Sequence, residues 1–282
     1  MVETLVIAFR ETLETSLIVG IILAFLFRSK QERYTSAVYW GVGLAVVASV
    51  ITALLFNKFA GGFEGPAEQI FEGTTMLFAA VLLTYMIFWM MFQRGIKQKL
   101  ESKVAQKLDR GEFLGIMGLT FFEVFKEGVE TVIFLQAIAF GARSWDIVFG
   151  IVGIIAAVLV GYLLFATSIN VNLKRFFAVT SVFLILFAAG LAAHAIHEYQ
   201  EAGLVTLGTH ELWNLNPPQN PDGSYPLLHE DGHVGHILKG LFGYRGNPTL
   251  LEVIGYVAYF VIIGSVLFWL KKREWVPVSA PQ

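Results

Sequence analysis

Three ionisable residues, Arg10, Glu11 and Glu14, interrupt an apolar run near the start of the chain, in the stretch FRETLETSLIVGIILAF. The run is long and apolar enough to cross a membrane, where ionisable side chains are costly and usually functional. The two glutamates are spaced i, i+3, so on a helix their carboxylates share one face about one turn apart. Such a pair offers oxygen ligands to a hard or borderline cation such as iron, manganese, calcium or magnesium.

The same pattern recurs in the stretch FKEGVETVIFLQAIAFG, which lies 116 residues further along the chain (127 − 11 = 116). The matched pairs are Arg10 and Lys126, Glu11 and Glu127, Glu14 and Glu130, and Thr15 and Thr131. Each copy opens a unit of three apolar runs, and an odd number of spans inverts the second copy relative to the first. The sequence therefore predicts an inverted repeat, with four carboxylates converging near the membrane midplane.

Seven apolar runs are long enough to be membrane-spanning helices. They lie at roughly 4–27, 37–57, 70–92, 114–140, 146–168, 176–197 and 250–270. Threading seven spans puts the basic connections on one side, which the positive-inside rule makes cytoplasmic. We therefore expect an all-α polytopic membrane protein with its N-terminus outside and its C-terminus inside.

The whole chain, 1–282, reads as one transmembrane domain with five parts. These are a first three-helix repeat (1–93), a cytoplasmic connector (94–113), a second repeat (114–198), an extracytoplasmic loop (199–249), and a seventh helix with a cytoplasmic tail (250–282). The polar connector is typical of a short amphipathic helix. The extracytoplasmic loop is rich in proline and turn dipeptides, so we expect no continuous helix in it.

Composition agrees with a membrane protein and excludes several kinds of site. Hydrophobic residues make up 56% of the chain and charged residues 15%, and the mean hydropathy is +0.65. The net charge of −2 gives no reason to expect a nucleic-acid partner. The chain contains no cysteine, which excludes disulfides, thiolate metal sites and iron–sulfur clusters. A metal would therefore be held by oxygen or imidazole ligands.

The motif cations, Arg10 and Lys126, would repel a bound cation, so they need an explanation. They can neutralise part of the glutamate charge while the site is empty. The structural alternative is that these are buried ion pairs that only fix helix packing. Duplication of the pattern in opposed helices favours the functional interpretation. Glu123, one turn before Glu127, extends the carboxylate row toward the cytoplasm.

A second set of candidate ligands lies toward the outside. Glu72 begins a run of about twenty uncharged residues. The stretch HAIHEYQE supplies His194, His197 and Glu198, of which the first and last are spaced i, i+4 and could share a metal. The alternative is that these side chains only face water. We interpret the group as an entry vestibule.

The stretch HEDGHVGH carries three further histidines, His229, His233 and His236. They could seat a metal, or they could belong to a polar loop by chance. We favour the polar loop, because a turn-rich stretch does not preorganise ligands.

The motifs RETLE and KEGVE, the FEG start of the third run and the stretch HAIHEYQEAG resemble the oxidase-dependent iron permease family of fungi and bacteria. That family carries R-E-G-L-E in its first and fourth helices within a seven-span fold, and this chain departs from it at Thr12 and Lys126. Lysine keeps the charge but loses the bidentate geometry of arginine. The resemblance extends over essentially the whole chain.

The resemblance implies that the four motif glutamates translocate iron, either as Fe³⁺ or as Fe²⁺. It also implies a multi-pass protein of the bacterial inner membrane without enzymatic activity, without an organic cofactor, and partnered by an extracytoplasmic oxidase that delivers ferric iron. The sequence leaves open whether the protein forms homo-oligomers.

Three alternatives remain open. The first is a carrier of another divalent metal, such as manganese or lead, because carboxylates select hardness more than identity. The second is a membrane-embedded dinuclear metalloenzyme, which would need Glu-x-x-His pairs at midplane depth. The third is a proton-linked transporter of an organic substrate.

Overall fold

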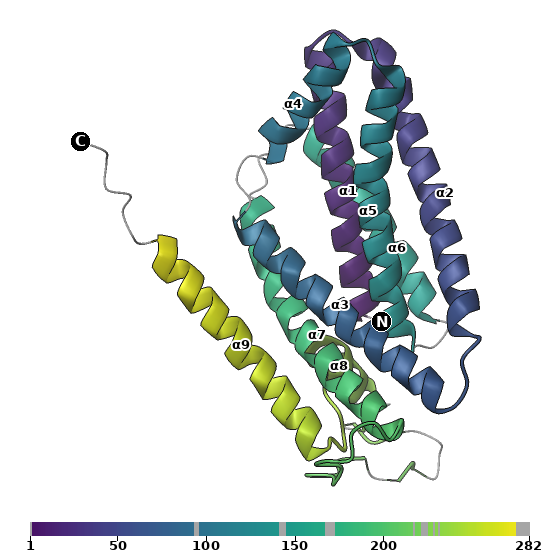
Figure 1. The fold of residues 1–282 in the computed structure, drawn as a ribbon, viewed down its shortest axis with the longest axis vertical. Helices are drawn as coiled ribbons and strands as arrows, with labels where there is room; N and C mark the ends of the chain where they lie inside the picture. Colours follow the sequence, from purple (N-terminus) through teal and green to yellow (C-terminus); the bar gives the residue numbers. More distant parts are fainter. Residues whose placement is uncertain are drawn as a thin grey trace.

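The computed structural model describes residues 2–92, 96–140, 145–166, 173–216, 218–220, 225–227, 229–230 and 232–274. Apart from one isolated antiparallel bridge between Glu211 and Thr249, the regular structure of these residues is helical. The elements are α1 (Val2–Arg28), η1 (Glu32–Tyr34), α2 (Thr35–Ala60), α3 (Pro66–Phe92), α4 (Ile96–Asp109), α5 (Phe113–Ala139), α6 (Trp145–Ala166), α7 (Leu173–Glu201), α8 (His233–Phe242) and α9 (Leu250–Glu274) (Figure 1).

Each of the seven expected apolar runs forms one long helix. In the described part of the chain, five helices are long and apolar enough to cross a membrane: α2, α3, α6, α7 and α9. The two other long helices, α1 and α5, have 27 residues each and carry the two copies of the charged motif. The charges that interrupt their apolar surface are thus concentrated in the helices that begin the two repeats.

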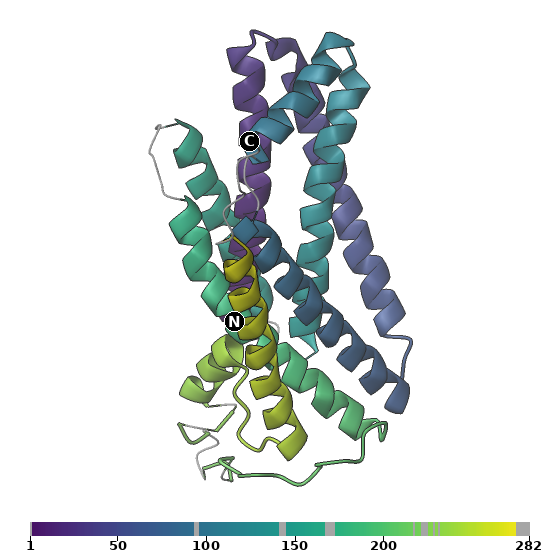
Figure 2. The same ribbon diagram turned by 60° about the vertical axis from the view of Figure 1, so that its left-hand side comes forward.

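The two repeats interlock. The first helix of each repeat packs along the second helix of the other, α1 against α6 and α5 against α2. The equivalent helices α1 and α5 also contact one another, as do α3 and α7. In both ribbon views α1 and α5 run in opposite directions (Figures 1 and 2). This exchanged, antiparallel pairing is the arrangement that an inverted repeat predicts.

Glycine allows the exchanged pairs to approach closely. A Cβ atom on Gly41 of α2 would lie 2.6 Å from the carbonyl oxygen of Met117 in α5. A Cβ atom on Gly153 of α6 would lie 2.6 Å from the carbonyl oxygen of Leu5 in α1. Small residues at such contacts let helix backbones pack together without a hydrophobic driving force between them.

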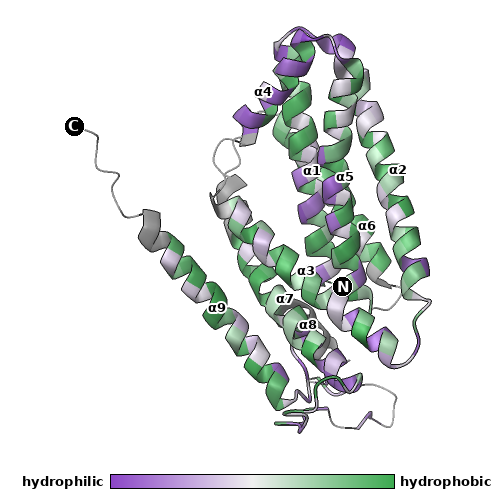
Figure 3. Ribbon diagram, viewed as in Figure 1, coloured by the Kyte–Doolittle hydropathy of each residue, from purple (hydrophilic) through white to green (hydrophobic). Residues whose placement is uncertain are grey.

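The connector between the repeats forms helix α4, as its polar, proline-free sequence predicts. Its apolar face, with Leu100 and Val104, is buried in one cluster with Ile22 and Leu26 of α1. On its polar face, Lys103 forms an ion pair with Glu123 of α5. Figure 3 shows hydrophilic residues gathered at this end of the bundle and again halfway along α1 and α5.

The described residues of the segment 199–249 form no continuous helix, but they include one short helix, α8, which the turn-rich sequence did not indicate. The helix follows Gly232 and ends at Gly243, which adopts a left-handed conformation (φ 65°) and donates its N–H to the carbonyl oxygen of Lys239. The backbone of Gly243 lies against Gly190 of α7, where a Cβ atom would come within 2.5 Å. The segment therefore folds back onto the bundle, and its proline-rich part precedes the helix.

Candidate metal centre

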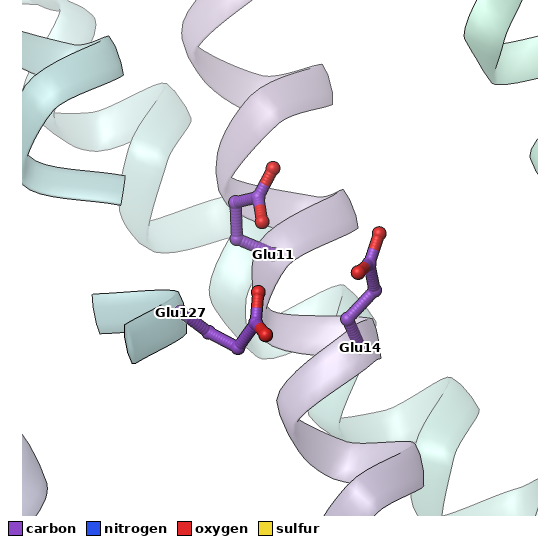
Figure 4. Close-up of side chains that lie close together, drawn as sticks. All are labelled: Glu11, Glu14 and Glu127. Atoms are coloured by element: carbon purple, nitrogen blue, oxygen red, sulfur yellow. The ribbon is translucent and has the colours of Figure 1, made fainter. Parts of the chain in front are cut away.

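Three carboxylates of the two motifs converge where α1 meets α5. Glu11, Glu14 and Glu127 each offer one ligand oxygen, and these atoms all lie within 4.8 Å of one another (Figure 4). Among the described residues this is the only such group of histidine, aspartate and glutamate side chains. Glu11 is 1% exposed and Glu127 is 4% exposed. Three of the four carboxylates that the repeated motif was expected to bring together thus lie side by side.

Two oxygens of this cluster have neither a hydrogen-bond donor nor an ion-pair partner. Glu11 Oε2 and Glu127 Oε2 are buried and lack a partner among the described residues. A buried acceptor without a partner costs on the order of 1–3 kcal/mol, and more when the group is charged. Oxygens left in this state are free to coordinate a cation, which would remove that cost.

Arg10 is the counter-ion of the first motif. Its guanidinium is 0% exposed, and it lies 2.7 Å from Glu11 Oε1 and 2.7 Å from Glu14 Oε1. The planar group thus bridges both glutamates of its own motif, with a separate nitrogen for each carboxylate.

Lys126 is the counter-ion of the second motif. Its Nζ atom lies 3.3 Å from Glu127 Oε1 and 3.2 Å from Glu130 Oε1, although 52% of the side chain is exposed. Glu130 lies outside the group of three but is close enough to interact electrostatically with Glu11 and Glu14. The four motif glutamates therefore form one electrostatic cluster, with three of them at its centre.

The motif threonines support the helices rather than the cluster. Thr15 Oγ1 donates to the carbonyl oxygen of Glu11 at 3.0 Å, and Thr131 Oγ1 donates to that of Glu127 at 2.8 Å. Each hydroxyl is thereby turned toward its own helix backbone.

Helix α3 supplies site residues that the sequence did not reveal. Arg10 Nη1 donates to Met86 Sδ at 3.0 Å, and Arg10 Nη2 donates to Met90 Sδ at 2.8 Å. Lys126 Nζ lies 5.3 Å from the centre of the Trp89 ring, within the range of a cation–π interaction. From the sequence alone, a tryptophan near a helix end such as Trp89 is interpreted as an anchor at the membrane interface. The sequence signal that could have identified them is the spacing of Met86, Trp89 and Met90, which places the three side chains on one face of the third span.

The remaining candidates of the translocation path lie apart from the cluster. Glu123 pairs with Lys103 of α4, with 2.9 Å between Oε1 and Nζ. Glu72 of α3 interacts electrostatically with Glu198 of α7. Neither belongs to the three-carboxylate group.

The outer histidines lie in an ion-pair network that includes two residues the sequence did not single out, Arg245 and Glu252. His197 Nδ1 lies 3.0 Å from Glu252 Oε1, and its Nε2 lies 2.9 Å from Glu201 Oε1. Arg245 Nη2 lies 3.0 Å from the same Nε2 atom. His194 is in ring contact with His197, with 6.2 Å between centroids. Both nitrogens of His197 are therefore engaged within the protein.

Glu252 also caps the start of helix α9, which begins at Leu250. Its backbone N–H lies 3.3 Å from Thr249 Oγ1, and its Oε1 accepts from the N–H of Thr249 at 3.3 Å. This reciprocal pair is the capping box that the sequence T-L-L-E encodes. The buried Glu252 carboxylate thus caps the first turn of α9 and also pairs with His197.

Of the three loop histidines, His229 stacks on Tyr225 with 4.4 Å between ring centroids. The side chains of His233 and His236 lie outside the described part of the structure, so the choice between metal site and polar loop stays a prediction for them.

Comparison with known proteins places the chain in a family. Residues 1–274 match the iron permease FTR1 family. The chain is 35% identical to the ferrous iron permease EfeU of Yersinia pestis over 279 residues, which cover 95% of this chain and 93% of the relative. It is also 35% identical to the ferrous iron permease EfeU of Escherichia coli O6:H1 over 278 residues, 97% of each chain. No solved structure matches. With a family match over nearly its full length and relatives named as permeases, the chain belongs to the iron permease FTR1 family.

Proposed function

We propose that this protein takes up iron across a cell membrane through the carboxylate cluster between α1 and α5. The observation that carries the proposal is the convergence of Glu11, Glu14 and Glu127 from antiparallel helices, with two buried oxygens left without a donor. Carboxylate oxygens suit iron, and intramembrane carboxylates mark ion pathways by default. Burial of the cluster at the repeat interface matches where transporters hold their substrates.

We propose the membrane topology that the sequence predicts. α1 and α5 join the five apolar helices as spans in this proposal, because Arg10 and the motif glutamates lie at the cluster with little exposure. Seven spans then leave the N-terminus outside and the C-terminus inside, since the basic turns beside α4 belong to the cytoplasmic side. The cell membrane of a bacterium is the compartment that fits the named relatives.

Charge favours the ferrous ion as the bound species. The four motif glutamates and the two motif cations carry a formal charge of −2 when all are ionised (2 − 4 = −2). A divalent ion neutralises this charge, whereas a trivalent ion leaves an unbalanced positive charge in a region of low dielectric constant. The relatives are also named as ferrous iron permeases. Ferric iron handed over by a partner oxidase, which the sequence resemblance implied, is the alternative.

Uptake into liposomes tests both statements. The purified protein is reconstituted, and entry of ⁵⁵Fe is measured with ascorbate, which keeps iron ferrous, and separately with ferric citrate. We expect uptake with ferrous iron and none above empty liposomes with ferric citrate. Uptake of ferric iron alone would reverse the assignment of oxidation state, and uptake of neither ion would contradict the proposed function.

Glu127→Gln tests the site itself. The amide preserves shape but removes an anionic oxygen, so uptake should fall by about 100-fold, at the upper end of what loss of a metal-site residue costs. Glu112→Gln is the matched control, since it removes a carboxylate just before the first residue of the same helix, at the end next to α4, where Glu112 pairs with Lys107. Unchanged uptake in Glu127→Gln would show that iron does not pass through this cluster.

A further inference from the structure

We propose that Met86 and Met90 of α3 determine which cations this permease accepts, by offering thioether sulfur to transition-metal ions that displace Arg10 from its glutamates. The proposal rests on the proposed function and adds a specificity filter to it. It favours borderline-soft divalent ions such as Fe²⁺ over hard ions such as Mg²⁺ and Ca²⁺.

The two sulfurs surround the same cation as the motif carboxylates. Arg10 Nη1 lies 2.7 Å from Glu11 Oε1 and 3.0 Å from Met86 Sδ, and Nη2 lies 2.7 Å from Glu14 Oε1 and 2.8 Å from Met90 Sδ. One buried positive charge is therefore held by two carboxylate oxygens and two thioether sulfurs. The donor set around it is mixed oxygen and sulfur, although the chain has no cysteine.

Thioether is an unusual choice of acceptor for a buried guanidinium. The sulfur of methionine is a weak hydrogen-bond acceptor, and a hydroxyl, amide or carbonyl oxygen would hold an arginine better. Thioether sulfur is, however, a soft metal ligand that hard cations do not favour. The pair of sulfurs is therefore poorly explained by the arginine alone and well explained by a metal.

Metal and arginine compete for the same oxygens. A divalent ion at Glu11, Glu14 and Glu127 cannot share those carboxylates with the guanidinium at close range, because like charges repel strongly where water is excluded. Arg10 must then release at least one glutamate, and the sulfurs beside it become free to turn toward the ion. Methionine has three flexible side-chain bonds, so its sulfur can follow such a shift.

The spacing fits a role for both residues. Met86 and Met90 are one turn apart on α3, so they present their sulfurs from the same face of that helix. α3 contacts α5, and Trp89 between the two methionines reaches Lys126. The third helix of the first repeat thus contacts both motif cations.

Competition in liposomes tests the proposal. Uptake of ⁵⁵Fe²⁺ is measured in wild type, Met86→Leu, Met90→Leu and the double variant, against rising Mg²⁺, Ca²⁺, Mn²⁺ or Co²⁺. We expect Mg²⁺ and Ca²⁺ to inhibit the double variant at concentrations lower by about 10-fold, the scale on which groups around a metal site alter affinity. Inhibition by Co²⁺ should weaken or stay unchanged, whereas inhibition by Mn²⁺, which prefers carboxylate oxygen, should follow that by Mg²⁺ and Ca²⁺.

Met76→Leu is the matched control, because Met76 lies on the same helix, is as buried as Met86 and packs within the apolar core. It should leave every inhibition curve unchanged. If the methionine variants shifted all four cations equally, or none, the sulfurs would only pack against Arg10 and the proposal would be overturned.

X-ray absorption at the iron edge gives a readout independent of transport. Wild type loaded with Fe²⁺ in detergent should show a sulfur scatterer at bonding distance, and the double variant should show only oxygen or nitrogen. Oxygen-only coordination in wild type would refute the proposal while leaving iron uptake through the glutamates intact. Loss of iron transport in wild type would instead be a failure of the proposed function.

Discussion

Arg10 and Lys126 occupy equivalent positions in the two copies of the motif, but the Arg10 side chain is fully buried whereas 52% of the Lys126 side chain is exposed. Both residues pair with the two glutamates of their own motif. Their other contacts differ, because Arg10 reaches two methionine sulfurs and Lys126 lies over the Trp89 ring. The two motifs thus share the same pattern of ion pairs but differ in the burial and the other contacts of their cations.

Exchanging the two cations should reveal this asymmetry. Arg10→Lys leaves one buried nitrogen where two guanidinium nitrogens hold Glu11 and Glu14 separately, and losing a buried pair costs about 3–5 kcal/mol. We expect a clear fall in the melting temperature of the detergent-solubilised protein and loss of iron uptake. Lys126→Arg, at a half-exposed position, should change the melting temperature little and keep uptake. Equal effects of the two variants would show that their different burial has no consequence.

The glycine contacts between the repeats predict a difference in stability within one helix. Gly41→Ala places a methyl group 2.6 Å from the carbonyl oxygen of Met117, and overpacking of this kind costs about 1–3 kcal/mol. Gly43, two residues away on α2, has open space around it. Gly43→Ala should therefore be neutral or stabilising by up to about 1 kcal/mol. Thermal unfolding of both variants measures the difference, and similar melting temperatures would contradict the close approach of α2 and α5.

The attachment of α8 should depend on pH through Glu230, which lies outside the membrane-spanning helices. Burial alone would raise the pKa of Glu230, but Lys239, the Gly246 N–H, Arg245 and Asn216 together hold that pKa below its ordinary 4.5. A depressed carboxyl pKa stabilises the folded state above about pH 4.5, and this stabilisation is lost as the pH falls through the folded-state value. Acidification below about pH 4 should therefore loosen the segment around Gly246.

Hydrogen–deuterium exchange checks this expectation, with rates corrected for the intrinsic effect of pH. Peptides that contain Gly246 should lose protection on acidification, while peptides from the middle of α5 should not. Glu230→Gln should reproduce the loss at pH 7, because the amide mimics the protonated acid. Unchanged protection in this variant would mean that the carboxylate does not hold the segment.

Much of the fold could be predicted from the sequence because its signals are local and repeated. The apolar runs give the helices, and the duplicated R/K-E-x-x-E pattern gives both the inverted repeat and the meeting of Glu11 with Glu127. The charges that make α1 and α5 poor candidates for spanning a membrane are the same charges that identify the site. Periodicity and duplication therefore sufficed for the architecture and for the central carboxylates.

The other site residues could not be predicted, because their roles arise from packing between distant helices. Met86 and Trp89 look like ordinary residues of an apolar span until α3 is placed beside the motif cations. Arg245 lies in a segment that reads as a loop, and its contact with His197 depends on α8 folding back onto α7. A contact between segments about 50 residues apart leaves no periodic trace in the sequence.

The outer network predicts how the two groups of residues should differ in transport. His194 and Glu198 lie near the C-terminal end of α7, beside His197 and its partners Arg245 and Glu252, whereas Glu127 lies in the central cluster. A cation that must enter and leave needs sites of graded affinity along its path. His194→Ala and Glu198→Gln should therefore slow iron uptake chiefly at low external iron, where capture limits the rate, and saturating iron should restore it. Glu127→Gln should not be rescued at any concentration, because it removes a ligand on the path itself.

Uptake measured over a wide range of iron concentrations would separate a raised KM from a lowered maximal rate. A lowered maximal rate in the outer variants, with KM unchanged, would show that His194 and Glu198 do not act as a capturing vestibule.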